Sequence, residues 1–416
     1  ITQSGFSILL LGGDGNDTIT LNDGPLLTDG LALLVAGGNG DDTITLNGGL
    51  SLLVSGGSGD DVITLNSGSG VLLLIGRDGD DTITINSNAG VLLLGGGDGD
   101  DTITNLGFLG AARTGDGDHN LVNGGTIFGP VDLEGGDDTL ILQPGFSFEL
   151  FGITGTVSGG DGSDTLGFRN LGTVDPSIMN NLTSFENLGF FGGETTLIGD
   201  WTFSGFTAVY EGTFILAQGA TLTTTSLTVD PGGTANIIGT LTATTGRTDN
   251  AGTLLVNGRL NSTVYNTGLV GGAGTISGDL YNSGTVSPGN SIGTLNVGGS
   301  YAHGSGATYI AEVTAGGQSD LLNVAGRADL NGGAVLTVLP RALYPDGFNW
   351  TILTAAGGID GTFAQVQGQP DSPVLSLTLN YGTHDVGLQV SRTPYESFGN
   401  SSGERATGAG LDLSLI

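Results

Sequence analysis

The first hundred residues alternate apolar and polar positions in one short segment that recurs five times. Each copy has a Gly-Asp-rich stretch followed by Thr-Ile-Thr-Leu-Asn or a close variant, and the copies begin at residues 12, 37, 56, 76 and 96. Alternation with β-branched residues is typical of a half-buried strand. The Gly-Asp stretch predicts a turn. A period near 20 residues predicts one solenoid rung per copy.

Apolar runs lie between the copies, at 31–36, 50–55, 71–75 and 91–94, and predict a second strand in each rung. A single rung cannot bury its Ile and Leu side chains, so several must stack. Only alternate side chains of a strand face the core, so the others predict an apolar strip on the outside. Either a partner or the N-terminal segment Phe6–Leu11 covers this strip.

The Thr-x-Thr pairs, such as Thr18/Thr20 and Thr43/Thr45, are expected to point outward in two files, interrupted by Val62. Such files resemble those of ice-binding β-solenoids, although Thr is also a common solvent-facing strand residue.

Stacking also predicts a column of aspartates, because one copy follows another at the strand spacing of about 4.8 Å. Its members are Asp17, Asp42, Asp61, Asp81 and Asp101. Neighbouring carboxylates repel unless something neutralises them, and Ca²⁺ prefers carboxylate and carbonyl oxygens. A metal-free turn is the alternative.

Four of the copies match the nonapeptide GGxGxDxUx position by position, and the fifth departs only at Arg77. In this they resemble the calcium-binding β-roll of the repeats-in-toxin family, which holds calcium between stacked loops through the last Asp and loop carbonyls. The apolar half of each rung departs from that family's pattern. The candidate calcium ligands are Gly12, Asp14, Asp17, Gly37, Asp42, Gly56, Asp61, Asp78, Asp81, Asp98, Asp101 and Asp164.

Weaker copies follow at 114–120, 133–138 and 159–166, and His119 stands where the last Asp of the motif belongs. His119 is expected to be a surface replacement rather than a ligand, because calcium prefers oxygen. From 213 to 300 the chain reads as short strands with Gly, Asn and Asp turns. Helical periodicity is absent, so a parallel β-helix is predicted throughout.

The stretch from Gly284 to about Val390 resembles the C-terminal part of a Gram-negative autotransporter passenger. The residues that carry this likeness are GTVSPGNSIGTL (284–295), SDLLNVAG (319–326), WTILT (350–354) and GGIDGTF (357–363). The resemblance implies the last rungs of a β-helix, a capping module that assists folding, and export through the outer membrane. Residues 395–413 resemble the linker toward a membrane barrel, which would belong to the same precursor and is not in this chain.

Composition narrows the function. The formal net charge is −32, with nine basic residues, all Arg. This argues against nucleic acid and anionic membranes, whose partners need basic surfaces. The chain has no Cys, so neither disulfides nor thiol chemistry are available. It begins at Ile1 without Met, which suggests a processed or truncated chain.

No local signature of catalysis is visible. The three histidines, His119, His303 and His384, are far apart in sequence, and HExxH does not occur. The serine loop around Ser287–Ser291 is better explained by the rung pattern. One Asp per rung is more typical of structure than of a single active site, so the sequence predicts a protein that is not an enzyme.

The sequence therefore predicts an all-β, right-handed parallel β-helix with a C-terminal cap. Its expected parts are rungs with GGxGxD loops (1–175), narrower rungs (176–300), the cap (301–392) and the linker (393–416). The expected function is a surface-exposed or extracellular adhesin or self-associating protein of aggregates and biofilms, stabilised by calcium, with itself or a host receptor as partner. A hydrolase built on a β-helix is the alternative, and ice binding a more remote one.

Overall fold

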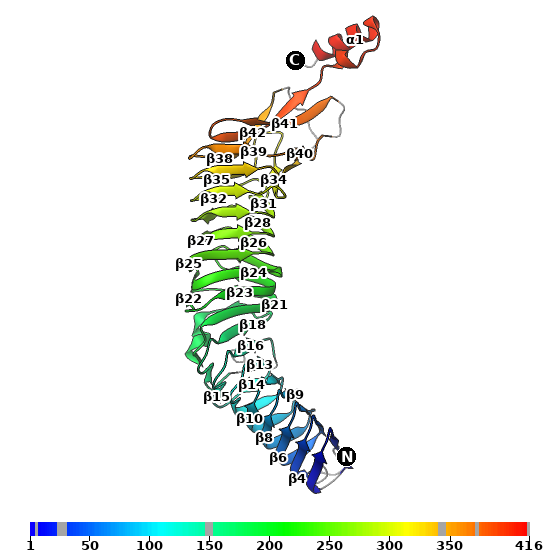
Figure 1. Cartoon of the computed structure of the whole chain (residues 1–416), viewed down its shortest axis with the longest axis vertical. Helices are drawn as coiled ribbons and strands as arrows, with labels where there is room; N and C mark the ends of the chain where they lie inside the picture. Colours follow the sequence, from blue (N-terminus) through cyan, green and yellow to red (C-terminus); the bar gives the residue numbers. More distant parts are fainter. Residues whose placement is uncertain (5–6, 23–30, 146–152, 340–346, 371–373, 414–416) are drawn as a thin grey trace. The chain divides into compact units, whose positions relative to one another are not determined.

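The computed structural model describes residues 1–4, 7–22, 31–145, 153–339, 347–370 and 374–413. It is nearly all β, with parallel strands stacked as a solenoid of about 14 turns, and it confirms the predicted fold class. The chain divides into two compact units, Ile1–Thr213 and Phe214–Ile416. Figure 1 shows the strands of each unit stacked one above another.

Two parallel sheets form most of the first unit. The sheet of Thr-Ile-Thr strands, here the threonine sheet, contains β1 (Thr2–Ser4), β3 (Thr18–Asn22), β5 (Thr43–Asn47), β7 (Val62–Leu65), β9 (Thr82–Ile85), β11 (Thr102–Asn105), β13 (Asn120–Asn123), β16 (Thr139–Leu142), β18 (Thr165–Phe168), β19 (Gly172–Val174) and β21 (Asn187–Leu197). The opposite sheet, here the leucine sheet, contains β2 (Ser7–Asp14), β4 (Leu31–Asn39), β6 (Gly49–Ser58), β8 (Ser69–Asp78), β10 (Gly90–Asp98), β12 (Phe108–Arg113), β14 (Thr126–Ile127), β15 (Val131–Asp132), β17 (Val157–Ser158) and β20 (Leu182–Thr183).

The threonine sheet has the alternation that the sequence predicts. Equivalent residues of successive copies pair in register, as Ile19 with Ile44 and Thr20 with Thr45. The Ile and Leu side chains are fully buried, whereas Thr18 and Thr43 are exposed. The threonines therefore point outward because the β-branched and leucine residues between them fill the core.

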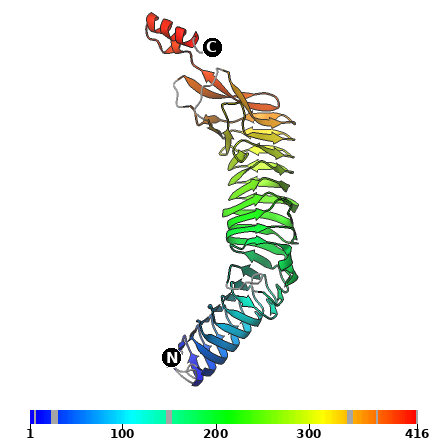
Figure 2. The ribbon, with the colours of Figure 1, turned by 180° about the vertical axis from the view of Figure 1, so that it is seen from behind.

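The leucine sheet keeps equivalent residues of successive copies in register but leaves one position of each apolar run unpaired. Ala32 pairs with Ser51 and Leu34 with Leu53, while the residues between them, Leu33 and Leu52, have no register partner. The irregularity lets two consecutive leucines of a strand face outward before Val35 and Val54 return to the core. Figure 2 shows these strands from behind.

The segment expected to cover the leucine strip does not do so in its described part. Leu9 and Leu11 lie on β2, which pairs with β4 as a further rung, and both side chains are about half exposed. Phe6 lies outside the described residues, as does 146–152 in the insertion that the sequence places around Pro144–Val157.

After η2 (Pro176–Asn180), β22 (Asp200–Thr202) and β23 (Thr207–Leu216), the strands of the second unit run in three parallel columns. They are β24 (Thr221–Ile237), β25 (Thr240–Asn250), β26 (Thr253–Val256), β27 (Arg259–Asn266), β28 (Leu269–Gly272), β29 (Thr275–Ile276), β30 (Leu280–Asn282), β31 (Thr285–Pro288), β32 (Thr294–Val297), β33 (Tyr301–His303), β34 (Thr308–Glu312), β35 (Leu321–Val324), β36 (Ala328–Asn331), β37 (Ala334–Val338), β38 (Asn349–Ala355), β39 (Ile359–Thr362) and β40 (Gln365–Gln367).

An antiparallel hairpin of β41 (Leu375–Tyr381) and β42 (Asp385–Arg392) ends one column, because β42 pairs antiparallel with β38. Large side chains fill the unit here, and the Trp350 indole donates to the Thr314 carbonyl at 2.9 Å. Covering the last parallel strand of this column removes an edge that could pair with other chains.

One expectation about secondary structure is wrong. The sequence suggested no helix, yet η3 (Tyr395–Phe398) and α1 (Ser402–Leu413) follow the cap. The Glu404 carboxylate accepts from the backbone N–H groups of Asn400 and Ser401, at 3.0 and 2.9 Å, and so caps the helix start. Within the described residues, no helix is both long and apolar enough to cross a membrane. The finer division into four parts stays a prediction.

Candidate functional site

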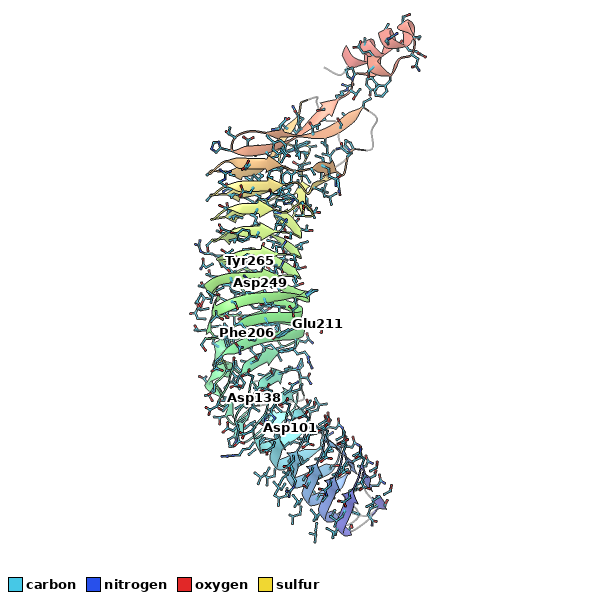
Figure 3. The ribbon with its side chains drawn as sticks, viewed as in Figure 1. Asp101, Asp138, Phe206, Glu211, Asp249 and Tyr265 are labelled. Atoms are coloured by element: carbon cyan, nitrogen blue, oxygen red, sulfur yellow. The ribbon has the colours of Figure 1, made fainter. Side chains whose placement is uncertain are left out.

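The last aspartates of the GGxGxD loops form one continuous ladder inside the first unit. The backbone N–H of Asp42 donates to Oδ1 of Asp61 at 2.7 Å, and that of Asp61 to Oδ1 of Asp81 at 2.8 Å. The same bond joins Asp17 to Asp42 and Asp81 to Asp101. Each carboxylate thus closes the loop of the preceding rung, which is why the motif repeats an acceptor at this position. Figure 3 marks Asp101 and Asp138 of this ladder.

The second oxygen of these carboxylates has no donor. Six such atoms are buried without a hydrogen-bond partner among the described residues: Oδ2 of Asp42, Asp61, Asp81, Asp101, Asp138 and Asp164. The first Gly of each loop makes room for them, since a Cβ on Gly37 would collide with Oδ2 of Asp42 and lie 2.6 Å from the Gly56 carbonyl oxygen. A carboxylate oxygen and a carbonyl oxygen therefore converge beside a backbone that only Gly can provide.

Burial changes the acidity of the ladder. Loss of solvation raises the pKa of Asp61 and Asp101 to about 6 and that of Asp81 and Asp138 to about 7, from an ordinary value of 3.8. The backbone N–H donated to each carboxylate lowers its pKa, but less than burial raises it. Burial also raises the pKa of Asp164. Several carboxyl groups of the ladder therefore titrate close to neutral pH.

His119 belongs to this ladder, and the expectation of a surface replacement is wrong. Its side chain is 1% exposed, and its Nδ1 accepts the backbone N–H of Asp101 at 3.1 Å. Its own N–H donates to Oδ1 of Asp138 at 2.7 Å. Because Nδ1 accepts this bond, Nε2 is the ring nitrogen left to donate, and it lies 3.2 Å from the Gly115 carbonyl. A residue that replaces a ladder Asp must accept the backbone N–H of the preceding rung. The position of His119 in its copy of the motif could therefore have predicted this role.

The carboxylates of the ladder and the neighbouring loop carbonyls provide some, but not all, of the ligands that a calcium ion needs. Unpartnered carboxylate oxygens beside carbonyl oxygens are hard ligands. Among the described residues, however, no three acidic or histidine side chains gather at one point, so backbone carbonyls and water would have to complete the coordination shell. Gly12, Gly37 and Gly56 lie against the ladder, whereas Asp14, Asp78 and Asp98 are exposed at the outer edge of the loops. The buried ladder is thus separate from the outer carboxylates.

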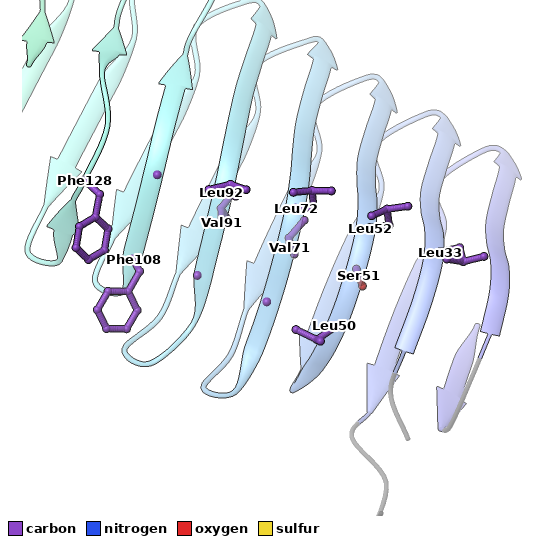
Figure 4. A pocket seen from close by; sticks show the side chains of 13 residues that line it. Leu33, Leu50, Ser51, Leu52, Val71, Leu72, Val91, Leu92, Phe108 and Phe128 are labelled. Carbon is purple, nitrogen blue, oxygen red and sulfur yellow. The ribbon is translucent and has the colours of Figure 1, made fainter. Parts of the chain in front are cut away.

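The leucine sheet carries an open apolar groove of about 540 Å³. One wall is the column of unpaired positions, Leu33, Leu52, Leu72 and Leu92. The ends are Leu50 on one side and Phe108 with Phe128 on the other, and no charged residue lines the groove (Figure 4).

The histidines do not meet a serine in the part of the chain that the structure describes. His303 is buried against Tyr301, whose hydroxyl lies 2.6 Å from its Nδ1, and against the Phe363 ring at 4.9 Å between ring centroids. Burial lowers the pKa of His303 to about 4, so the ring is neutral at neutral pH. His384 lies in an exposed turn with its Nδ1 2.8 Å from the Thr383 hydroxyl.

These features define an all-β protein whose parallel solenoid has a carboxylate ladder inside and an apolar face outside. No protein-family model matches the chain. It is similar to a curated protein, the extracellular serine protease of Serratia marcescens, with 34% identity over 200 residues. The match covers 45% of this chain and 19% of that protein, so the chain spans about a fifth of its relative's length.

This similarity corrects one prediction and supports another. The sequence favoured a protein that is not an enzyme, and that prediction is wrong, because the similar protein is named as a protease. The missing signal was a longer-range likeness that a search for short catalytic motifs does not detect. A solenoid fold and an extracellular relative agree with the expectation of a secreted or surface-exposed protein.

Proposed function

We propose that this chain is the exported β-solenoid of an extracellular hydrolase, as in the passenger of an autotransporter. The observation that carries the proposal is the 34% identity over 200 residues to an extracellular serine protease. The parallel solenoid and the cap formed by β41 and β42 fit the same assignment. Such a solenoid provides a rigid scaffold on which loops from neighbouring rungs hold a substrate.

The test uses the full exported product, recovered from the culture medium. We expect it to hydrolyse fluorescent casein and to react with a fluorophosphonate probe at one serine. Both signals should disappear after treatment with phenylmethylsulfonyl fluoride or after heat denaturation. Neither turnover nor labelling in a product with an intact β circular-dichroism spectrum would contradict the proposal. Peptide mapping of the labelled serine then assigns the nucleophile.

Calcium binding to the aspartate ladder is a second proposal. Its support is the set of buried Oδ2 atoms without a donor and the raised pKa values of their carboxyl groups. A bound divalent cation would neutralise the ladder and stabilise the folded rungs. The residues that would hold it are Asp42, Asp61, Asp81 and Asp101, with loop carbonyls.

An adhesive or self-associating role is a second candidate function, favoured by the exposed apolar face of the leucine sheet. Apolar patches of this kind are more typical of contact surfaces than of solvated ones. Host receptors and ice binding have no comparable observation in their favour.

A further inference from the structure

The leucine sheet exposes more apolar surface than a monomer normally carries. Ten large apolar side chains on this face, from Leu9 to Phe128, are 41–63% exposed. An aromatic side chain presents roughly 150–250 Å² when fully exposed and a leucine less, so ten half-exposed side chains, eight of them leucines, offer at most on the order of 800 Å². Monomers seldom show patches above about 600 Å², and a standard interface needs about 800 Å² from each partner. The face is therefore large enough for a stable dimer.

The face also has a built hollow. One outward-facing column runs Leu50, Gly70, Gly90, Phe108 in direct register along β6, β8, β10 and β12. Two glycines on adjacent rungs thus stand between two large side chains. The Leu50 side chain leans over the first of them, with its Cδ2 2.7 Å from where a Cβ of Gly70 would stand, so the open space in this column is centred on Gly90. Together with Leu72 and Leu92 they shape the groove of about 540 Å³. Figure 4 shows Leu50 and Phe108 at opposite ends of this stretch.

The same face carries a projection of matching size. The rings of Phe108 and Phe128 stack with 6.0 Å between their centroids and 18° between their planes, and both are about half exposed. They come from adjacent rungs, as Gly70 and Gly90 do. A stacked aromatic pair and a glycine pair with the same rung spacing therefore lie side by side on one surface.

We propose that this face binds a second copy of the chain in an antiparallel two-fold dimer. Rotation by 180° places the Phe108–Phe128 pair of one copy over the Gly70–Gly90 hollow of the other, and the reverse contact forms at once. A two-fold interface requires such self-complementarity. Two aromatic anchors seated in pockets are the usual energetic centre of an interface. The inference goes beyond the hydrolase and does not depend on it.

Charge explains why the contact is confined to this face. The chain has a net charge of −32, so two copies repel each other, and an uncharged groove is where approach costs least. Salt screens such repulsion at a Debye length of about 10 Å at 0.1 M. Dimerisation should therefore strengthen as salt rises, the opposite of an association through ion pairs.

The test is sedimentation velocity of the purified chain from about 1 to 100 µM, at 50 and 500 mM NaCl. We expect a single monomer–dimer equilibrium with a dissociation constant in the micromolar range that falls several-fold at the higher salt. A monomer at every concentration and salt would overturn the proposal. So would open-ended oligomers, or a monomer that carries a co-purified lipid or peptide in the groove by native mass spectrometry.

Two variants distinguish the contact between the Phe108–Phe128 pair and the glycine hollow from non-specific hydrophobic association. Replacing both aromatics, Phe108→Thr with Phe128→Thr, should weaken dimerisation at least tenfold. Gly90→Leu adds apolar surface but fills the hollow, and a Cβ there meets its nearest atom, on Phe108, at 3.5 Å, which is an ordinary van der Waals contact. It should also weaken dimerisation at least tenfold, whereas non-specific association would strengthen.

Val338→Thr is the matched control, since Val338 is an equally exposed apolar residue on β37 of the second unit. It should leave the dissociation constant unchanged. Melting temperatures equal to that of the unsubstituted chain show that each variant is folded. A dimer that persists in the Gly90→Leu variant would refute the proposed contact.

Discussion

Both units stack polar residues inside the solenoid, but they differ in how the stacked side chains are hydrogen-bonded. In the second unit Asn250, Asn266 and Asn282 form a ladder in which each Nδ2 donates to the next Oδ1, at 2.6 and 2.7 Å. The first unit has a similar ladder from Asn47 to Asn86 at the ends of the Thr-Ile-Thr strands. In the part of the chain that the structure describes, the first unit alone adds a ladder of aspartates, at the loops that precede those strands.

An amide both donates and accepts, so each later member of the asparagine ladder receives a donor on its Oδ1, and only Oδ1 of Asn250, at the end of the ladder, is left without one. A carboxylate only accepts, and six carboxylates of the aspartate ladder, from Asp42 to Asp164, each have one buried oxygen without a donor among the described residues. A proton or a cation must compensate the charge of these buried carboxylate oxygens. Stability of the first unit should therefore depend on calcium, and on pH through several carboxyl groups, whereas in the second unit burial raises the pKa of one carboxyl, that of Asp320, to about 6.

The largest expected effect is a change of pH and calcium on the first unit. The folded ladder keeps protons up to about pH 6–7, whereas unfolded aspartates release them near 3.8. Stability from these groups is therefore full below about pH 4 and is lost as pH rises through 6–7. Without calcium we expect the melting temperature of the first unit to fall by about 5–10 °C from pH 5 to pH 8. Calcium should restore it at pH 8, and less at pH 5, where protons compete.

The two tryptophans allow each unit to be followed separately, since Trp201 lies in the first and Trp350 in the second. Thermal melts of the Trp350→Phe and Trp201→Phe variants are read by fluorescence, with calcium or with chelator. If the Trp201 signal melts at the same temperature with calcium and with chelator at pH 8, the calcium proposal fails.

Asn266→Asp should have the next largest effect on stability, because it introduces a carboxylate into the asparagine ladder of the second unit. The Asn266 amide donates to Oδ1 of Asn282 at 2.7 Å and to the Thr285 carbonyl at 3.0 Å. A carboxylate there faces acceptors, so we expect a loss of about 3 kcal/mol at pH 8 and a smaller loss at pH 5. Urea unfolding measures it. Asn323→Asp, at an exposed amide that donates to Asn296, is the control and should change stability little.

Asp81→Asn is the reverse substitution and should stabilise. Its Oδ1 can still accept the Asp61 N–H, now without a buried charge. We expect a gain of about 1 kcal/mol at pH 8 without calcium, and almost none at pH 5, where the raised pKa of about 7 already leaves Asp81 protonated. Asp80→Asn, at an exposed neighbour, should be near neutral. A destabilised Asp81→Asn variant at pH 8 would show that the charge itself is required.

Arg77→Gly should have the smallest effect. Arg77 stands at a loop position where the other copies have Gly, and its φ of 99° lies in the left-handed region. Relief of this strain, offset by loss of the bond from Nε to the Ser55 hydroxyl, should stabilise by about 0.5 kcal/mol. Gly97→Ala is the contrast, because its Cβ would collide with the Arg77 carbonyl at a φ of 137°. It should destabilise clearly, and equal effects of the two would contradict the strain argument.

Repeated residues made most of the fold predictable. Because each copy places Ile and Leu at alternate positions, the inward column from Ile19 to Ile103 and the outward threonines follow from sequence alone. Isolated features were harder. The helix α1 has a mixed and partly small-residue sequence, and His119 looked like a lost ligand until its two hydrogen bonds placed it inside the ladder.

The candidate site was predictable only in part. The aspartate column was expected, but which oxygen is bonded and which is left alone depends on the position of the neighbouring rung. The proposal of a hydrolase, likewise, rests on similarity over 200 residues to a protein named as a protease rather than on a local motif.

The sequence by itself determined the rung, its period and its inward and outward positions, because these depend on contacts between residues close in the chain and repeated in each copy. The tertiary structure decided what the stack does. In the described part of the stack, the second oxygen of the ladder carboxylates has no donor. One position of each apolar run in the leucine sheet has no register partner, and Gly70 and Gly90 lie between Leu50 and Phe108. These features arise between rungs, from register and close approach, which no single copy encodes.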